Sequence, residues 1–480
     1  MYSHLTVAGR QRTALFLPTA YWLPTAYWEE GAMAHRHIVV GLVLLVMVSM
    51  LAGVMVRGAS AGSTVRTIAV GRNPLAVAVD ERIGRAFILN NAGNSVSMLD
   101  TATGTLLRTV AVGRDPLALA VDERTGHVFV ANNDLGLQDQ LSLALNCCPR
   151  GKGSVTVLDA RSGAIQRTVR VGLSPLAIAV DERVGRAFVV TYGSDSRTGR
   201  LSVLDTHSGT VVRTVTVGLL PQGVALDERT GRVFVAGEDS SGLGDVSVLD
   251  VMSGRLVRSV TVGQAPGPIA VDQRTGRAFV INQNSDSVSV LDTHSGALVH
   301  TTNLGGDLFD LAVDEQTGRV FVANGNNVQV NGRPSMLDGS VSILDATSGR
   351  LVRSVSVGML PTAVAVDARS GRVFVANKGP VDGNLVPLGN GAVTVLDARS
   401  GAVLRTVGVG TYPTAIAVDE RAGRAFVVNA SGTTVRTSQG WWEPAVQWLQ
   451  PARLPWLPPL APPSLIHSVT GSVSMLDASR

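Results

Sequence analysis

The stretch VDERTGHVFVAN at residues 121–132 returns as VDEQTGRVFVAN at 313–324 and as VDARSGRVFVAN at 366–377, and close variants occur five more times. Each copy holds two apolar runs separated by a short polar segment with Asp and Gly, which is typical of two β-strands joined by a tight turn. An internal repeat outweighs an estimate of domain number from length. The 480 residues are therefore expected to contain one repeat architecture rather than two or three unrelated domains.

A complete repeat lies at residues 357–409. Its four apolar runs are VGMLPTAVAVD (357–367), RVFVAN (372–377), AVTVLD (392–397) and AVLRTVGV (402–409). They are rich in Val, Phe and Thr and are bounded by Gly, Asp, Asn or Ser, which favours strands over helices. We name them strands a, b, c and d of a four-stranded antiparallel meander.

Asp and Gly mark the a–b turn of every repeat. The Asp carboxylate can accept backbone N–H groups of the turn, and the Gly four residues later can adopt a positive φ. We therefore expect these aspartates to be structural rather than catalytic. The aspartates are Asp80, Asp122, Asp181, Asp227, Asp272, Asp314, Asp367 and Asp419, and the glycines are Gly84, Gly126, Gly185, Gly231, Gly276, Gly318, Gly371 and Gly423.

Strand a is poorer in bulky side chains than strand b. Sheets that converge on an axis leave least space at their innermost strand, which predicts a β-propeller with strand a inside. The Phe of strand b is then expected to pack between neighbouring blades. These residues are Phe87, Phe129, Phe188, Phe234, Phe279, Phe321, Phe374 and Phe426.

The two ends of the repeat region predict how the propeller closes. Strands a, b and c occur eight times, but the d-type run STVRTIAVG (63–71) precedes them all, and SVSMLDASR (472–480) is a c strand with no d strand after it. Pairing these ends would remove exposed sheet edges. The predicted fold is all-β: a single eight-bladed β-propeller of four-stranded antiparallel blades, closed by the N-terminal strand d pairing with the C-terminal strands a, b and c.

The repeats resemble the YVTN family of β-propeller repeats. The resemblance rests on the Pro-led strand a, the VD…TGR turn, the aromatic strand b ending in Asn, the SVSVLD-type strand c and the VG that closes strand d, and it covers 63–480 apart from two insertions. The chain departs from the family pattern in FVVT and FVAG, which lack the Asn, and in Leu308, which replaces the Pro. The resemblance implies an exported or surface protein without assigned chemistry, although similar propellers include lactonases, a lyase, and haem and quinone enzymes.

The N-terminal segment indicates export. Residues 38–56 form 19 uncharged, apolar positions, preceded by MAHRH and followed by RGASAG. This stretch predicts a signal peptide cleaved after Ala61 or a signal-anchor helix that stays in the membrane, and we keep both. Residues 1–37 are a cytoplasmic leader, or a leader assigned in error with the true start at Met33. Residues 57–62 are a linker or cleavage site, and 63–480 form the propeller.

Composition excludes several function classes. Without the first 61 residues the chain has 37 basic and 35 acidic residues, too balanced for a nucleic-acid-binding surface. Cys147 and Cys148 are adjacent, so they cannot form a disulfide framework, and their redox state stays open. No histidine falls in a d–a loop, and we predict no cofactor, no metal and no catalytic residue.

Variation is concentrated on one side of the predicted propeller. In an antiparallel meander the d–a and b–c connections emerge on one face, and two b–c connections are long, at 133–153 and 430–471. The second contains Trp441, Trp442, Trp448 and Trp456. Three interpretations stay open for it: a lid over the channel mouth, a set of aromatic anchors for a partner, or an insertion without function.

The d–a loops supply the other candidate binding residues. Charged residues mark repeats one, two and six, and apolar ones mark repeats three, four, seven and eight. The candidates are Arg72, Arg114, Leu173, Leu219, Leu220, Asp307, Asp310, Met359, Leu360 and Tyr412. They predict a binding or scaffolding module for a protein, peptide or glycan at the cell envelope, secreted or membrane-anchored, with membrane contact only through the N-terminal helix. The alternative is a lactonase- or lyase-like enzyme with a divalent cation held by Asp307, Asp310, Glu238 and Asp239.

Overall fold

The computed structural model describes residues 65–134, 153–193, 197–325, 327–330, 333–336, 338–381, 388–430 and 470–478. Ser63–Arg480 forms one unit, separate from Met1–Gly62. The leader, the signal segment and the cleavage site therefore lie outside the described residues. Over the described ranges the chain is all-β apart from one 3-10 turn, η1 (Gln283–Ser285), and none of its helices is long and apolar enough to cross a membrane.

Repeats one to seven form the expected antiparallel strands in chain order, and the strands of repeat eight are joined by β1 from the N-terminal end of the repeat region. The strands are, for repeat one, β2 (Pro74–Asp80), β3 (Arg85–Asn90), β4 (Ser95–Asp100) and β5 (Leu106–Ala111); two, β6 (Pro116–Asp122), β7 (His127–Asn132), β8 (Ser154–Asp159) and β9 (Ile165–Arg170); three and four, β10 (Leu173–Asp181), β11 (Arg186–Tyr192), β12 (Thr198–Asp205), β13 (Val211–Asp227), β14 (Arg232–Glu238), β15 (Gly244–Asp250) and β16 (Leu256–Thr261); five, β17 (Pro266–Asp272), β18 (Arg277–Asn282), β19 (Ser287–Asp292) and β20 (Leu298–Asn303); six, β21 (Asp307–Asp314), β22 (Arg319–Gly325), β25 (Asp338–Asp345) and β26 (Leu351–Met359); seven, β27 (Pro361–Asp367), β28 (Arg372–Asn377), β29 (Ala392–Asp397) and β30 (Val403–Gly408); eight, β31 (Pro413–Asp419), β32 (Arg424–Asn429), β33 (Ser472–Asp477) and β1 (Arg66–Ala69). A hairpin, β23 (Asn327–Val330) and β24 (Arg333–Met336), is added in repeat six.

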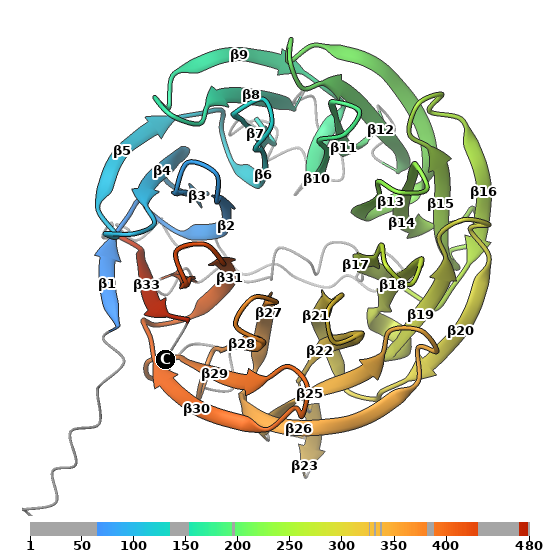
Figure 1. Cartoon of the computed structure of the whole chain (residues 1–480). Helices are drawn as coiled ribbons and strands as arrows, with labels where there is room; N and C mark the ends of the chain where they lie inside the picture. The colour runs from blue at the N-terminus through green and yellow to red at the C-terminus, as the bar shows by residue number, and fades with distance from the viewer. Residues whose placement is uncertain are drawn as a thin grey trace, which may run out of the picture. The chain divides into compact units, whose positions relative to one another are not determined.

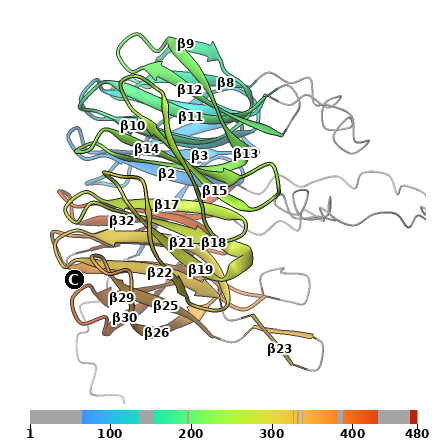
Figure 2. The same ribbon diagram turned by 90° about the vertical axis from the view of Figure 1, so that its right-hand side faces the viewer.

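The sheets are arranged as in a β-propeller (Figures 1 and 2). Each inner strand contacts the inner strand of the next repeat, in the order β2, β6, β10, β13, β17, β21, β27 and β31, and β31 contacts β2. Strand β13 runs through the outer position of repeat three and the inner position of repeat four, which joins their strands into one seven-stranded sheet. The expected pairing of the terminal strands is present, because β1 pairs antiparallel with β33, with Ile68 opposite Val473.

The hydrophobic core lies between neighbouring sheets. The eight Phe residues of the second strands are at most 1% exposed, as predicted. Phe279 of repeat five packs with Leu311 and Val322 of repeat six, and at the terminal joint Phe426 packs with Ile88 of repeat one. Each Phe therefore joins two sheets, and the joint between repeats eight and one is packed like the others.

The Asp of each a–b turn is structural, as expected. Asp80 is fully buried, and its Oδ1 accepts the backbone N–H of Ile83 at 3.1 Å. Gly84 closes the turn with a φ of 66°, a conformation that a residue with a Cβ adopts only with strain.

The Glu and Arg that follow this Asp clamp neighbouring repeats together, which the sequence analysis did not recognise. The backbone N–H of Glu81 donates to Oε1 of Glu123 in repeat two at 2.9 Å, and Nε of Arg82 donates to the carbonyl of Glu123 at 2.7 Å. At the terminal joint, the N–H of Glu420 donates to Oε1 of Glu81 at 2.9 Å. The equivalent Glu is replaced by Gln273 in repeat five and Ala368 in repeat seven.

The Asn that ends the second strand packs against the Gly of the d–a loop that precedes the first strand of the same repeat. Nδ2 of Asn90 donates to the hydroxyls of Ser95 and Ser97 at 3.2 and 3.0 Å. A Cβ added at Gly71 would lie 2.5 Å from Cγ of Asn90, so any larger residue at Gly71 would displace the Asn. This contact explains why the repeat contains both the terminal Asn and the VG.

Candidate functional site

The d–a and b–c connections lie side by side, as predicted. The N–H of Asn91, just after β3, donates to the carbonyl of Asn73 in the d–a loop at 2.9 Å, and that of Lys378 donates to Leu360 at 2.9 Å. The a–b turns instead bond to c–d turns, for example from the N–H of Thr101 to the carbonyl of Gly84 at 3.1 Å. We call the first set of connections the loop side and the second the turn side.

A left-handed residue precedes the Pro of seven d–a loops. These residues are Asn73, Asp115, Ser174, Leu220, Ala265, Leu360 and Tyr412, with φ between 42° and 57°. A bulky non-glycine residue rarely adopts this conformation. Because the conformation recurs in seven repeats, it belongs to the frame, and only the side chain presented there varies.

A chain of polar side chains runs along the loop side of repeats one to three. Nδ2 of Asn91 donates to Oδ1 of Asp115 at 2.6 Å, and Nδ2 of Asn133 donates to Oδ2 of the same carboxylate at 2.9 Å. Asn73 donates to Asn91 at 3.3 Å, and the hydroxyl of Ser174 donates to Asn133 at 2.8 Å. The candidates Arg72 and Arg114 are exposed next to two of these polar residues, Asn73 and Asp115. The sequence analysis missed the hydrogen-bonded network because its members come from five separate segments.

The apolar candidates belong to the same loop side, in repeats three, four, seven and eight. Leu173, Leu219, Leu220, Met359, Leu360 and Tyr412 are all half-buried. Nζ of Lys378 lies 3.1 Å from the hydroxyl of Tyr412 and 4.2 Å from its ring centroid. Lys378 is a further candidate that motif reasoning missed. It becomes a candidate only through its contact with Tyr412 of the next repeat, which the sequence does not show.

Asp310 lies three residues inside inner strand β21, at a position where no other repeat has a charged residue. The equivalent residues of the other repeats are small: Ala76, Ala118, Ala177, Gly223, Pro268, Ala363 and Ala415. Oδ2 of Asp310 accepts the backbone N–H of Val364, on inner strand β27, at 2.9 Å. Burial raises the pKa of Asp310 to about 6, although N–H groups of Val364 and Leu311 favour the charged form. Within the described ranges, no charged side chain offsets the cost of ionising this half-buried carboxyl.

The four carboxylates of the alternative cation site do not converge. Asp239 is used locally, because its Oδ1 accepts the N–H groups of Ser241 and Leu243 at 2.8 and 3.0 Å. Asp307 is exposed at the start of β21, and Glu238 ends β14, two repeats away. Among the described residues no three His, Cys, Asp or Glu side chains are grouped to hold a metal ion. The predicted four-carboxylate arrangement is therefore wrong.

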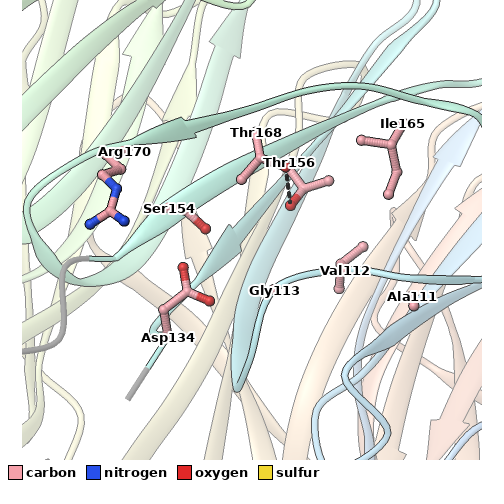
Figure 3. Close-up of a pocket in the computed structure, with 9 residues that line it drawn as sticks. All are labelled: Ala111, Val112, Gly113, Asp134, Ser154, Thr156, Ile165, Thr168 and Arg170. Carbon is pink, nitrogen blue, oxygen red and sulfur yellow. Dashed lines mark hydrogen bonds between the residues drawn. The ribbon is translucent and has the colours of Figure 1, made fainter. Parts of the chain in front are cut away.

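A pocket of about 520 Å³ lies between the outer parts of repeats one and two (Figure 3). Asp134, Ser154 and Arg170 line one end of it, and Ile165 lines the other. Its hydroxyls belong to the repeated frame: Thr156 and Thr168 lie 3.5 Å apart, as do the equivalent Thr394 and Thr406. The polar lining of this pocket is therefore a repeated structural feature, whereas the side chains of the loop side vary from repeat to repeat.

Several predicted features lie outside the described residues. They are Trp441, Trp442, Trp448 and Trp456, almost all of the insertions at 133–153 and 430–471, and Cys147 and Cys148. The three interpretations of the Trp-rich insertion remain open.

Comparison with known proteins supports the fold more than the chemistry. Dihydro-heme d1 dehydrogenase NirN, solved in complex with DHE, is 14% identical with a TM-score of 0.54, over 76% of this chain and 73% of that chain. Kuenenia stuttgartiensis hydrazine synthase is 16% identical with a TM-score of 0.48, over 78% of this chain and 96% of that chain. Among curated protein sequences, none matches this chain. Residues 268–446 match the model of the Choice-of-anchor I domain.

Proposed function

We propose that the protein is an exported or surface-attached β-propeller, eight-bladed and closed by its terminal strands, that binds a ligand or partner on its loop side. The pairing of β1 with β33 and the contact of β31 with β2 support the closed ring. The match of residues 268–446 to an anchor-type domain supports a place at the cell surface. The apolar segment 38–56 would provide the export signal and any membrane contact.

The contrast between the two sides carries this proposal. Turn-side residues repeat and are used to hold the repeats together, as Glu81 and Arg82 show. On the loop side the backbone repeats, but its left-handed position presents Leu220, Leu360 or Tyr412 without a common structural partner. Varied, half-exposed side chains on a rigid frame are typical of binding surfaces. The partner class is a protein, peptide or glycan of the cell envelope.

Matched charge substitutions on the two sides test the proposal. Leu220→Asp and Leu360→Asp place a carboxylate where Asp115 already adopts the same left-handed conformation, so the frame should be retained. We expect both to reduce capture of partners from envelope extract by residues 62–480 at least tenfold, because they put charge into an apolar contact. Met252→Asp, on the turn side and 71% exposed, is the control. Equal loss in the control, or full capture by both loop-side variants, would contradict the proposal.

A second candidate function is a hydrolase or lyase of lactonase type. Asp310 favours it, because a carboxyl whose pKa is about 6 can exchange a proton near neutral pH. Turnover of a panel of lactones should then follow a single ionisation near pH 6 and be lost in Asp310→Asn. Absence of turnover across the panel would remove this candidate and leave the binding proposal intact.

A further inference from the structure

At the inner edge of the propeller, the contact between repeats six and seven differs from the contacts between the other neighbouring repeats. Only in repeat six does strand a carry a carboxylate at this position, where the other repeats have Ala, Gly or Pro. Phe309 and Asp310 are half-exposed on β21, whereas Ala363 and Val364 on the facing strand β27 are buried. At this position of the inner strands, Asp310 is thus the one acidic residue among Ala, Gly and Pro.

The surroundings of Asp310 suit a cation rather than a second anion. The N–H groups of Val364 and Leu311 donate to its carboxylate. A residue of an antiparallel strand directs its N–H and C=O to the same side, so the carbonyl oxygens of these two residues face the same space. A negative carboxylate with carbonyl acceptors around it matches the three donors of an ammonium group.

Among the described residues, no charged side chain occupies that role. The strands packed against β21 carry their charged residues at their turn ends: Asp272 on β17, Arg277 on β18, Arg319 on β22 and Asp367 on β27. On β21 itself, Asp314 lies at the turn end and Asp307 is exposed at the loop end. None of them contributes to the ionisation behaviour of Asp310. A metal ion fits this site less well than an ammonium group, because no three metal-ligating side chains are grouped within the described ranges.

We propose that Asp310 binds the ammonium group of an amphiphilic amine whose apolar part extends toward the loop side. The apolar part would meet Met359 and Leu360, which adjoin the start of β27, the strand whose Val364 contacts Asp310. This inference rests on the proposed loop-side binding function and names the ligand class of that site. The energetic cost of an unpaired carboxylate is removed when the amine is bound.

Calorimetric titration with hexylamine at pH 8 tests the proposal, with hexan-1-ol as the uncharged probe. Hexylamine should bind at least tenfold more tightly than hexan-1-ol. Asp310→Asn should abolish the difference while folding normally, because the amide oxygen can still accept the N–H of Val364. Asp286→Asn, which removes a carboxylate of the loop side at a left-handed position that Asn also adopts, should leave binding unchanged.

The pH dependence supplies an independent readout. Protonation of Asp310 should weaken hexylamine binding about 30-fold between pH 8 and pH 4.5 and leave hexan-1-ol unaffected. Equal binding of amine and alcohol, or amine binding retained in Asp310→Asn, would overturn the inference. Loss of partner capture in Leu360→Asp alongside either result would show that the loop-side function stands and only its ligand class is wrong.

Discussion

The two sides of the propeller use the same repeat for different purposes. On the turn side, Asp, Glu and Arg recur because each makes a defined bond: Asp80 closes its own turn, Glu123 accepts from repeat one, and Arg82 donates to repeat two. On the loop side the backbone recurs, but the side chains change from Asn73 to Tyr412. The comparison teaches that repetition marks what holds the fold together, and departure from repetition marks where binding residues should be sought.

The largest expected effect comes from breaking a seam in the core. Phe426→Ala at the joint of repeats eight and one should lower the free energy of unfolding by about 3–5 kcal/mol, because Phe426 is fully buried between two sheets. Chemical denaturation gives the value. Leu404→Ala, at a residue 49% exposed on the outer strand of repeat seven, is the matched control and should change the free energy by under about 0.5 kcal/mol. A loss at Phe426 no larger than at Leu404 would contradict the proposed closure.

Substitution of Asp310 should raise the free energy of unfolding rather than lower it. Because its pKa is raised to about 6, the unfolded chain releases this proton at lower pH than the folded chain, so the wild type loses stability as pH rises from about 4 to 6. Asp310→Asn removes the charge and should stabilise the protein by about 1–3 kcal/mol at pH 7.5, with no gain near pH 4. Thermal unfolding across pH 4–8 measures the difference. A variant that is less stable at pH 7.5 would show that the carboxylate is structural.

The turn-side clamp predicts a smaller loss. Glu81→Ala removes the acceptor for the N–H of Glu420 and should lower the free energy of unfolding by about 1–2 kcal/mol. Glu81→Gln keeps an acceptor for this N–H and should be more stable than Glu81→Ala at pH 8. The amide should also be tolerated because it avoids a charge that burial and neighbouring carboxylates disfavour, as the raised pKa of Glu81 indicates. Denaturation midpoints of both variants at pH 8 decide this. Equal losses would mean that the hydrogen bond does not matter.

The smallest effect is expected at the c–d turns. The N–H and hydroxyl of Ser253, followed by Arg232, lower the pKa of Asp250, so its contribution is present at neutral pH and lost as pH falls below about 4. The carboxylate is about a third exposed, so Asp250→Asn should cost at most about 1 kcal/mol at pH 7 and nothing near pH 2. Stability measured at both pH values tests this. A loss that persists near pH 2 would show that the charge is not the cause.

The sequence predicted the strands and the seam-filling Phe residues because each depends on local patterning repeated eight times. It did not predict the clamp, because Glu123 is adjacent to the turn Asp in sequence but bonds to repeat one in space. Asp310 and Tyr412 were selected as departures from the repeat, yet their partners Val364 and Lys378 lie 54 and 34 residues away. The four-carboxylate site failed for the same reason, since Asp239 completes its own loop instead.

Oxidative footprinting of the complex captured from envelope extract tests the loop-side assignment most directly. The oxidisable side chains to follow are Met359 and Tyr412 on the loop side and Met252 on the turn side. Partner binding should protect Met359 and Tyr412 from oxidation and leave Met252 as reactive as in the free protein. Protection of Met252 with unchanged Met359 and Tyr412 would contradict the assignment.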